Sequence, residues 1–259
     1  MEFVFKVKER RSIVGREEEL NLLKESFYKK RMKNSILVGS AGCGKTTLVE
    51  KLAYDLKQDF LFKELSLGAI LAGTKYRGEL EEKVINFLDS IKKSPKPIIL
   101  FIDEIHTLTS CGGVEGAIGL GDIIKPYLSR GDITVIGATT PEEYWKTIYK
   151  DKALNRRLSP IFISDLDDDT IIKILDKFAD KKVSKETLKY ILEQTKSKAM
   201  VNPDASIEVL DRCMARNVVT SHEINNIMVD NIVKMLYGFN IPQQNENENE
   251  IKNSRKIKI

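Results

Sequence analysis

The chain has 259 residues, of which 42% are hydrophobic and 31% charged, a composition typical of a globular protein rather than a disordered or membrane-embedded one. Lys and Arg number 42 against 38 Asp and Glu, so the net charge of +4 gives no argument for nucleic-acid binding. No apolar run approaches the roughly 18 residues that span a bilayer, and the three cysteines have no paired spacing, so we expect a cytoplasmic protein with reduced thiols and no membrane partner.

The first half of the chain predicts alternating helices and strands. Apolar residues recur at helical spacing over residues 16–31, and a short apolar strand follows at Ile36–Val38. A glycine-rich turn separates this strand from a second predicted helix, which runs from Lys45 to about Lys57. Residues 61–65 then predict a second strand.

The same alternation continues to about residue 163. A helix is predicted over residues 79–92, and Pro95 and Pro97 end it. Ile98–Ile102 is apolar at every position, as parallel strands that are buried on both faces require. Two further strands are predicted at 133–136 and 161–163. Strands that alternate with helices predict a parallel sheet sandwiched by helices.

The pattern changes after Asp165, where only helical periodicity continues. Asn202-Pro203-Asp204 is a typical helix start, with proline near the first turn. The four predicted helices cover residues 168–180, 184–197, 203–217 and 221–236. We therefore expect four segments: an N-terminal extension at 1–10, an α/β domain at 11–165, a small all-α domain at 166–240, and a disordered polar tail at 241–259.

The glycine-rich turn fits the pattern G-x-x-x-x-G-K-[ST] between a predicted strand and a predicted helix. Glycines let successive backbone N–H groups curl around a phosphate, and the helix start adds the positive end of its dipole. Lys45 is expected to reach the β- and γ-phosphates of ATP, and the Thr46 hydroxyl is expected to bind Mg²⁺. The predicted nucleotide contacts here are Gly39, Ser40, Ala41, Gly42, Cys43, Gly44, Lys45, Thr46 and Thr47.

Two carboxylates complete this predicted site. Asp103 and Glu104 follow directly after the apolar strand at Ile98–Ile102. The carboxyl ends of parallel strands meet at one edge of the sheet, so both side chains are expected beside the phosphate loop. Asp103 is expected to hold Mg²⁺, and Glu104 is expected to orient or deprotonate the attacking water. No other metal site is expected.

Several separate motifs from Ser12 to about Ala215 resemble the first ATPase domain of Clp-type AAA+ unfoldases and disaggregases. The matching segments are Ile13–Leu20, Lys75–Glu79, Phe101–Leu108, Gly137–Tyr144, Ala153–Leu158 and Pro203–Ile207. The resemblance implies a P-loop NTPase fold, in which the α/β domain is followed by a small helical lid. It also implies that Ile13 and Val14 line the adenine.

The resemblance further implies a ring of six copies with ATP at each boundary between copies. Arg156 and Arg157 match the arginine fingers that reach into the neighbouring copy's site, and Thr140 matches the sensor residue near the attacking water. A finger raises the rate of hydrolysis by roughly 10³ to 10⁵ because it neutralises transition-state charge. Glu104, Thr140 and the two arginines are thus the expected catalytic residues.

The segment Lys75-Tyr76-Arg77 matches the loop that lines the central pore in that family and grips an extended polypeptide. An aromatic ring with a basic neighbour on each side holds an irregular chain without needing a particular sequence. The same trio could also stack on single-stranded nucleic acid. We expect a protein substrate threaded through the pore, and regard nucleic acid as the less favoured ligand.

Three hypotheses follow for the function. The leading one is a protein-remodelling ATPase that works as a homo-hexameric ring. The second is a nucleic-acid ATPase of the loader or initiator kind, because the core and lid are common to both classes. The third is an ATP-binding regulatory subunit that joins a larger Clp-type ring, because the family's usual additional domains have no room within these 259 residues.

Overall fold

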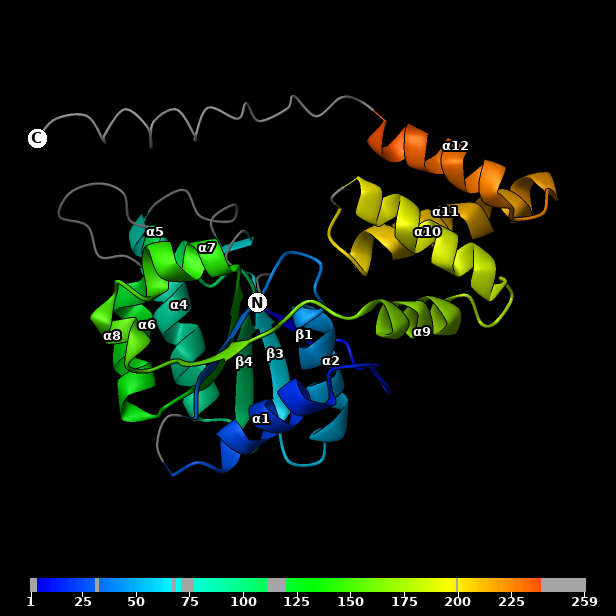
Figure 1. The fold of residues 1–259 in the computed structure, drawn as a ribbon. Coiled ribbons are helices and arrows are strands. Elements are labelled where there is room, and N and C mark those ends of the chain that lie inside the picture. Colours follow the sequence, from blue (N-terminus) through cyan, green and yellow to red (C-terminus); the bar gives the residue numbers. More distant parts are fainter. Residues whose placement is uncertain are drawn as a thin grey trace, which may run out of the picture.

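The computed structural model of the protein describes residues 4–30, 33–66, 69–70, 77–110, 120–198 and 200–238. Figure 1 shows an α/β part and a helical part, which are joined by the segment between the last strand and helix α9. Within the described residues, no helix combines the length and the apolar character needed to cross a bilayer.

The α/β part is built on a six-stranded sheet with the order β1-β3-β4-β5-β2-β6. Five strands are parallel, and β1 is antiparallel to β3. The expected fold class is confirmed, with one antiparallel edge strand added. The strands are β1 Val4–Lys6, β2 Ser35–Val38, β3 Leu61–Leu65, β4 Ile98–Ile102, β5 Thr134–Thr139 and β6 Ser159–Phe162.

Strand β1 differs from the expectation for residues 1–10, which placed them outside the α/β domain. Val4 pairs with Leu65 and Lys6 pairs with Lys63, so this segment forms one edge of the sheet. A strand of three residues has too few positions to display the alternation that identifies a strand in a sequence. Its pairing partner lies about sixty residues away in the chain, which local periodicity cannot reveal.

Helices cover both faces of the sheet. Alternate strand residues point to opposite faces, so Ile36 and Val38 join the core beneath α4 and α6, whereas Leu37 joins the core beneath α1 and α2. The helices of this part are α1 Glu17–Tyr28, α2 Lys45–Asp55, α4 Arg77–Lys92, α5 Thr107–Ser110, α6 Leu120–Arg130, α7 Pro141–Glu143, the π-helix η1 Tyr144–Ile148, and α8 Lys152–Asn155. The sequence did not predict the last five.

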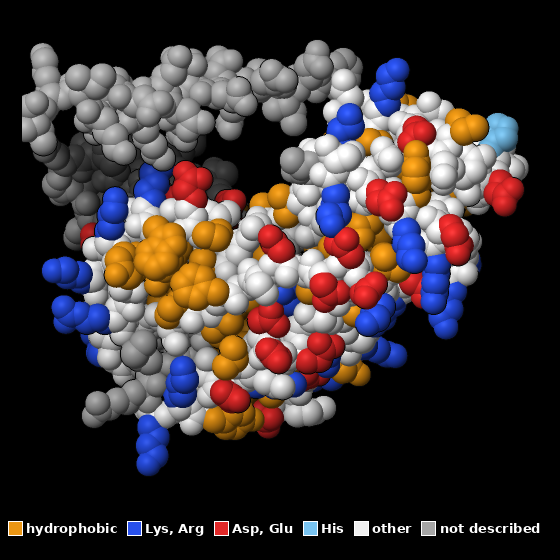
Figure 2. Space-filling view, in the orientation of Figure 1, with side chains coloured by type: hydrophobic (Ala, Val, Ile, Leu, Met, Phe, Trp, Pro, Cys, Tyr) orange, Lys and Arg blue, Asp and Glu red, His pale blue; other side chains and the backbone are white. Residues whose placement is uncertain are grey.

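An exposed aromatic cluster lies on η1 and the end of β6. Trp145 contacts Tyr149, with ring centroids 4.7 Å apart, and stacks on Phe162 at 6.3 Å. These three side chains are each about half exposed. Figure 2 shows a continuous hydrophobic area over the α7–α8 region of this face.

The helical part has its own hydrophobic core, centred on Leu175, Leu188, Val209 and Val229. Its helices are α9 Asp168–Phe178, α10 Lys185–Ser197, α11 Asp204–Thr220 and α12 Asn226–Tyr237. The four helices expected in this region are present. Side chains cap three of them, because Asp167, Ser184 and Asn225 each accept a hydrogen bond from a backbone N–H of the first turn.

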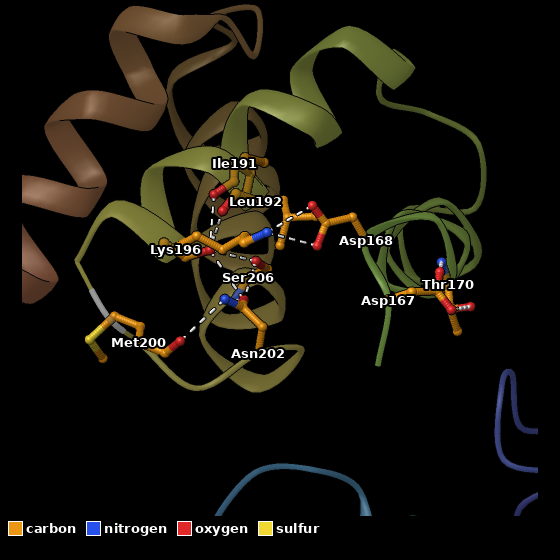
Figure 3. Close-up of polar contacts among 10 residues, drawn as sticks. Asp167, Asp168, Thr170, Ile191, Leu192, Lys196, Met200, Asn202 and Ser206 are labelled. Carbon is orange, nitrogen blue, oxygen red and sulfur yellow. Dashed lines mark hydrogen bonds and ion pairs between the residues drawn. The ribbon is translucent and has the colours of Figure 1, made fainter. Parts of the chain in front are cut away.

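A buried polar network fixes the start of α11 against α10 (Figure 3). The Thr195 hydroxyl lies 2.8 Å from Ser206 Oγ and 3.2 Å from Asn202 Oδ1. Asn202 Oδ1 also accepts a hydrogen bond from the Ser206 backbone N–H. Thr195 and Ser206 are fully buried, so each polar atom needs these partners. The network therefore sets the position of residues 203–207.

We predict that Thr195→Val, which keeps the side-chain shape, lowers the free energy of unfolding by about 1–2 kcal/mol, because Asn202 and Ser206 lose a buried partner. Urea denaturation followed by circular dichroism measures the change. Ser197→Ala is the matched control, since its exposed hydroxyl also bonds to a carbonyl of α10 and should contribute less than about 0.5 kcal/mol. Equal effects of the two substitutions would contradict the structural role of the network.

Candidate functional site

A pocket of about 780 Å³ lies at the carboxyl ends of the central strands, against the start of α11. This is the edge of a parallel sheet where ligands bind. The predicted residues that line the pocket are Ala41, Gly42, Gly44, Lys45, Thr46, Thr47, Asp103, Glu104 and Thr140. The other lining residues are Glu64, Leu65, Ser66, His106, Thr107, Thr139, Pro203, Asp204 and Ile207.

The phosphate loop follows β2 and leads directly into α2. Gly42 has φ +74° and Gly44 has φ +96°, a left-handed conformation that side chains other than glycine rarely adopt. Gly39 is constrained by space instead, because a Cβ there would lie 2.7 Å from Cys43 Sγ and 2.9 Å from Ile163 Cβ. The loop thereby presents its backbone N–H groups, together with the start of α2, to the pocket.

Lys45 and Cys43 have different environments within this loop. The Lys45 ammonium donates hydrogen bonds to the carbonyl oxygens of Gly39 and Ser40, each at 2.8 Å, which holds the charge over the loop. Cys43 is buried beneath the loop, and burial raises the pKa of its thiol. A thiol that remains protonated at neutral pH is a poor nucleophile, so Cys43 acts as a small packing residue.

Arg16 supports the loop from below, a role that the sequence did not predict. Its side chain is buried, and Nη2 donates to the Cys43 carbonyl oxygen at 3.1 Å. Nη1 forms an ion pair with Glu19 at 2.8 Å, which compensates the buried charge. The start of α1 is therefore tied directly to the phosphate loop.

The two predicted acids lie in a tight turn after β4. Glu104 has φ +47°, a strained value for a residue other than glycine. The turn is held by a hydrogen bond from the Glu104 N–H to Asp103 Oδ1 at 2.9 Å, and by one from the Thr107 N–H to the Glu104 carbonyl at 2.9 Å. Both acids line the pocket alongside Lys45 and Thr46, as the sequence predicted.

Two neighbouring threonines at the end of β5 have separate roles. Thr140 lines the pocket, and its hydroxyl accepts a hydrogen bond from the Glu143 N–H as the N-cap of α7. Thr139 is buried, and its hydroxyl lies 2.9 Å from His106 Nδ1. The His106–Thr139 contact links the turn after β4 to the end of β5, and the sequence analysis missed it. The proximity of His106 to Glu104 in the chain was the available signal.

A third carboxylate in the pocket belongs to Glu64, near the end of β3. Burial, together with the negative charges of Asp103 and Glu50, raises the pKa of this carboxyl. Nothing in the motifs marked Glu64, because it reaches the pocket only through the pairing of β3 with β4.

The helical part closes the pocket through Pro203, Asp204 and Ile207. Asp204 packs so closely on the phosphate loop that a Cβ added at Gly42 would lie 2.7 Å from Asp204 Cβ. Gly42 is thus required for two independent reasons, its positive φ and this contact. The contact places the start of α11 directly against the phosphate loop.

The predicted adenine and pore contacts lie outside this pocket or outside the described residues. Ile13 and Val14 are half-buried and do not line this pocket. Lys75 and Tyr76 lie outside the described residues, and Arg77 begins α4. The predicted pore contacts therefore remain predictions.

Arg156 and Arg157 lie near the amino ends of the strands, away from the nucleotide pocket at the carboxyl ends. They line a second pocket together with Asn34, Ile133 and Thr134, at the amino ends of β2 and β5. Arg157 is held within its own chain by hydrogen bonds to Ser129 and to the Ala153 carbonyl. The exposed Arg156 guanidinium makes no hydrogen bond or ion pair with any described residue.

The pocket has the donor groups that a magnesium nucleotide requires. Backbone N–H groups and Lys45 suit phosphate oxygens, whereas the Thr46 hydroxyl and the Asp103 carboxylate offer the hard oxygen ligands that Mg²⁺ prefers. Among the described residues no cluster of three or more His, Cys, Asp or Glu could hold a metal. A Mg²⁺ ion here would take its remaining ligands from phosphate oxygens and water.

Residues 35–166 match the ATPase family associated with various cellular activities (AAA). The chain is 39% identical over 221 residues to the chaperone protein ClpB of Aquifex aeolicus, which covers 79% of this chain and 22% of that protein. It is 35% identical over 227 residues to the ATP-binding subunit ClpC of the ATP-dependent Clp protease of Staphylococcus epidermidis, which covers 81% and 28%. The chain thus spans less than a third of these relatives' length.

The fold is similar to that of solved structures of Saccharomyces cerevisiae Hsp104. The Hsp104–ADP complex superposes with a TM-score of 0.78 at 28% identity, over 98% of this chain and 48% of that chain. The Hsp104–casein complex in its extended conformation has a TM-score of 0.77 at 28% identity, with the same coverage. The similarity extends over both the α/β part and the helical part.

We predict that Gly42→Ala weakens ATP binding at least about 10-fold, because a left-handed alanine costs about 1–2 kcal/mol and its Cβ displaces Asp204. Isothermal titration calorimetry measures the affinity.

Gly131→Ala is the matched control, since Gly131 has φ +72° but nothing within 4 Å of an added Cβ. It should carry the same backbone penalty and leave ATP affinity unchanged. Adding Asp204→Gly to the Gly42→Ala protein should recover part of the affinity. Wild-type affinity in the Gly42→Ala protein would disprove the proposed loop constraint.

Proposed function

This chain belongs to the AAA family of ATPases, and we propose that it is a ring subunit that couples the hydrolysis of Mg²⁺-bound ATP to the remodelling of polypeptide chains. Six copies would form the ring, with one nucleotide at each boundary between copies. The observation that carries this proposal is the separation of the nucleotide pocket from Arg156.

The pocket lies at the carboxyl ends of the strands, whereas Arg156 lies beside their amino ends. One chain therefore cannot bring its own Arg156 to its own nucleotide. A second copy placed head-to-tail can supply the arginine, and repeated head-to-tail association closes into a ring when the rotation permits. The absence of any hydrogen bond or ion pair from Arg156 to the described residues supports a partner outside the chain.

The residues of the pocket divide the work of hydrolysis. Lys45 and the loop amides would hold the β- and γ-phosphates, and Thr46 and Asp103 would hold Mg²⁺, which neutralises phosphate charge when bound. Glu104 would orient the attacking water, and the left-handed turn held by Asp103 would fix its backbone. Thr140 remains the proposed sensor residue, and Arg156 would stabilise the transition state in the neighbouring copy.

Remodelling is proposed from the relatives and from the pore segment. ClpB is a chaperone by name, and one Hsp104 structure is a complex with casein. ClpC is a subunit of a protease, so a proteolytic partner is a further possibility for this chain. In our proposal Tyr76, with Lys75 and Arg77, grips the polypeptide in the pore.

The trans arrangement predicts complementation between two inactive proteins. Arg156→Ala should lower ATP turnover about 10³-fold, and Glu104→Gln should bind ATP without hydrolysing it. In an equal mixture, half of the sites keep Glu104 and half of those face a neighbour with Arg156, so about a quarter of wild-type turnover should return. A coupled ATPase assay measures turnover.

The ring itself predicts a second result. Light scattering of the Glu104→Gln protein with ATP should give a mass near six chains.

Two results would count against this proposal. If the mixture stays inactive although mixed rings form, Arg156 does not act on a neighbouring copy. If the Glu104→Gln protein stays monomeric in saturating ATP, the chain does not form a ring alone. The regulatory-subunit hypothesis then becomes the better one, and co-purification with a larger Clp-type chain is its test.

The pore proposal predicts that Tyr76→Ala abolishes the remodelling of casein while ATP turnover stays within about 2-fold of wild type, because the aromatic ring is the grip and not part of the nucleotide site. Fluorescence of labelled casein during ATP hydrolysis measures remodelling. Tyr76→Phe keeps the ring and should keep the activity. Remodelling at the wild-type rate in Tyr76→Ala would rule out a grip by this residue.

A further inference from the structure

The second pocket is strongly basic. It has a volume of about 800 Å³ and is lined by no Asp or Glu. Its cationic side chains, named here the basic patch, are Lys30, Lys33, Arg130, Lys152, Arg156 and Arg157. Of these, Arg130 pairs with Asp132. No ion pair with a described residue is formed by Lys30, Lys33, Lys152 or Arg156. This positive charge is therefore available to an anionic partner.

An acidic patch lies at the other end of α1. Its residues are Glu17, Glu18, Asp165, Asp167, Asp168 and Asp169, all exposed. Asp167 caps α9 and Asp168 pairs with Lys196, but the other four make no ion pair with described residues. Figure 2 shows acidic side chains gathered over the segment that joins the two parts, and basic ones along the far margin of the α/β part.

The acidic patch lies near the phosphate loop. A Cβ added at Gly15 would lie 2.2 Å from a methyl group of Thr170 and 3.3 Å from Leu166, so the start of α1 packs against the joining segment. The next residue, Arg16, donates to the phosphate loop. The acidic residues at the start of α1 and in the joining segment therefore lie close to the phosphate loop, although none of them lines the pocket.

The two patches cannot neutralise each other within one chain. They flank the two ends of α1, a helix of 12 residues, which is roughly 18 Å long. At physiological ionic strength, charges more than about 8 Å apart are largely screened from each other. Each patch is therefore free to attract an oppositely charged surface of another molecule.

We propose that the acidic patch of one copy receives the basic patch of the next copy, so that complementary charge sets the order and direction of the ring. This inference rests on the proposed ring. Arg156 belongs to the basic patch and needs a nucleotide pocket in the second copy, and the acidic patch lies near the phosphate loop of that pocket. The same contact that delivers Arg156 thus pairs the two charged surfaces, which fixes the register and speeds association.

The test reverses the charge of each patch without altering the nucleotide pocket or Arg156. The basic-reversed protein carries Lys30→Glu, Lys33→Glu and Lys152→Glu, and the acid-reversed protein carries Glu17→Lys, Glu18→Lys and Asp169→Lys. With ATP at about 0.15 M salt, where surface charges still act at contact distances, each protein alone should remain monomeric in analytical ultracentrifugation. An equal mixture should assemble into rings of alternating copies, because every interface then pairs opposite charges.

Three controls make the result specific. Lys181→Glu, Lys182→Glu and Lys185→Glu change the net charge by the same amount on an exposed part of the lid and should leave assembly intact. Neutral versions with Glu17→Gln, Glu18→Gln and Asp169→Asn avoid placing positive charge at the start of α1 and should weaken assembly less than reversal. Thermal melting and ATP binding of each monomer verify that it is folded.

The outcomes separate this inference from the ring itself. Rescue by mixing supports the charge pairing. Rings formed by each reversed protein alone would overturn the pairing and leave the ring standing, as would folded monomers that fail to assemble when mixed while the wild type assembles. A wild-type protein that stays monomeric with ATP would overturn both. If the wild type bound a nucleic acid and the basic-reversed protein did not, while assembly was unchanged, the basic patch would belong to a different ligand. That result would overturn the inference.

Discussion

The arrangement around the nucleotide pocket depends on one backbone constraint, the positive φ angles of Gly42 and Gly44. This conformation turns successive N–H groups of the loop toward a common point, where an anion is stabilised. Contacts from three directions keep the loop in place: Thr139 accepts a hydrogen bond from it, Arg16 donates one to it, and Asp204 packs against it. The sheet, α1 and the helical part therefore all meet at this loop.

Most of the fold could be predicted because its core elements bury regular apolar patterns. Strand β4 is apolar at every position, and the helices from α9 to α12 display clear helical periodicity. The elements that were missed lack such a signal. Strand β1 is defined by a distant partner, α6 contains Pro126, and η1 departs from the 3.6-residue period on which the prediction relies.

The candidate site could be predicted where its residues are neighbours in sequence, as in the phosphate loop and the acidic pair after β4. Glu64 and Asp204 line the same pocket, but they come from separate segments, and only the strand order and the packing of the helical part bring them together. Ile13 and Val14 match a motif but lie outside the lining of this pocket, so their contact with adenine stays a prediction. Sequence spacing thus identifies site residues within one contiguous loop better than site residues that come together from distant segments.

The aromatic cluster on η1 has a spectroscopic consequence. Trp145 is the single tryptophan of the chain, and it is about half exposed within the run of short helices that leads from the end of β5 to Arg156. Its indole emission therefore reports on this one surface, with no background from other tryptophans. Any molecule that covers this surface would exclude water from the indole side chain of Trp145. The fluorescence emission would then shift to shorter wavelength. The unlabelled protein thus carries its own optical probe on the run of short helices that precedes Arg156.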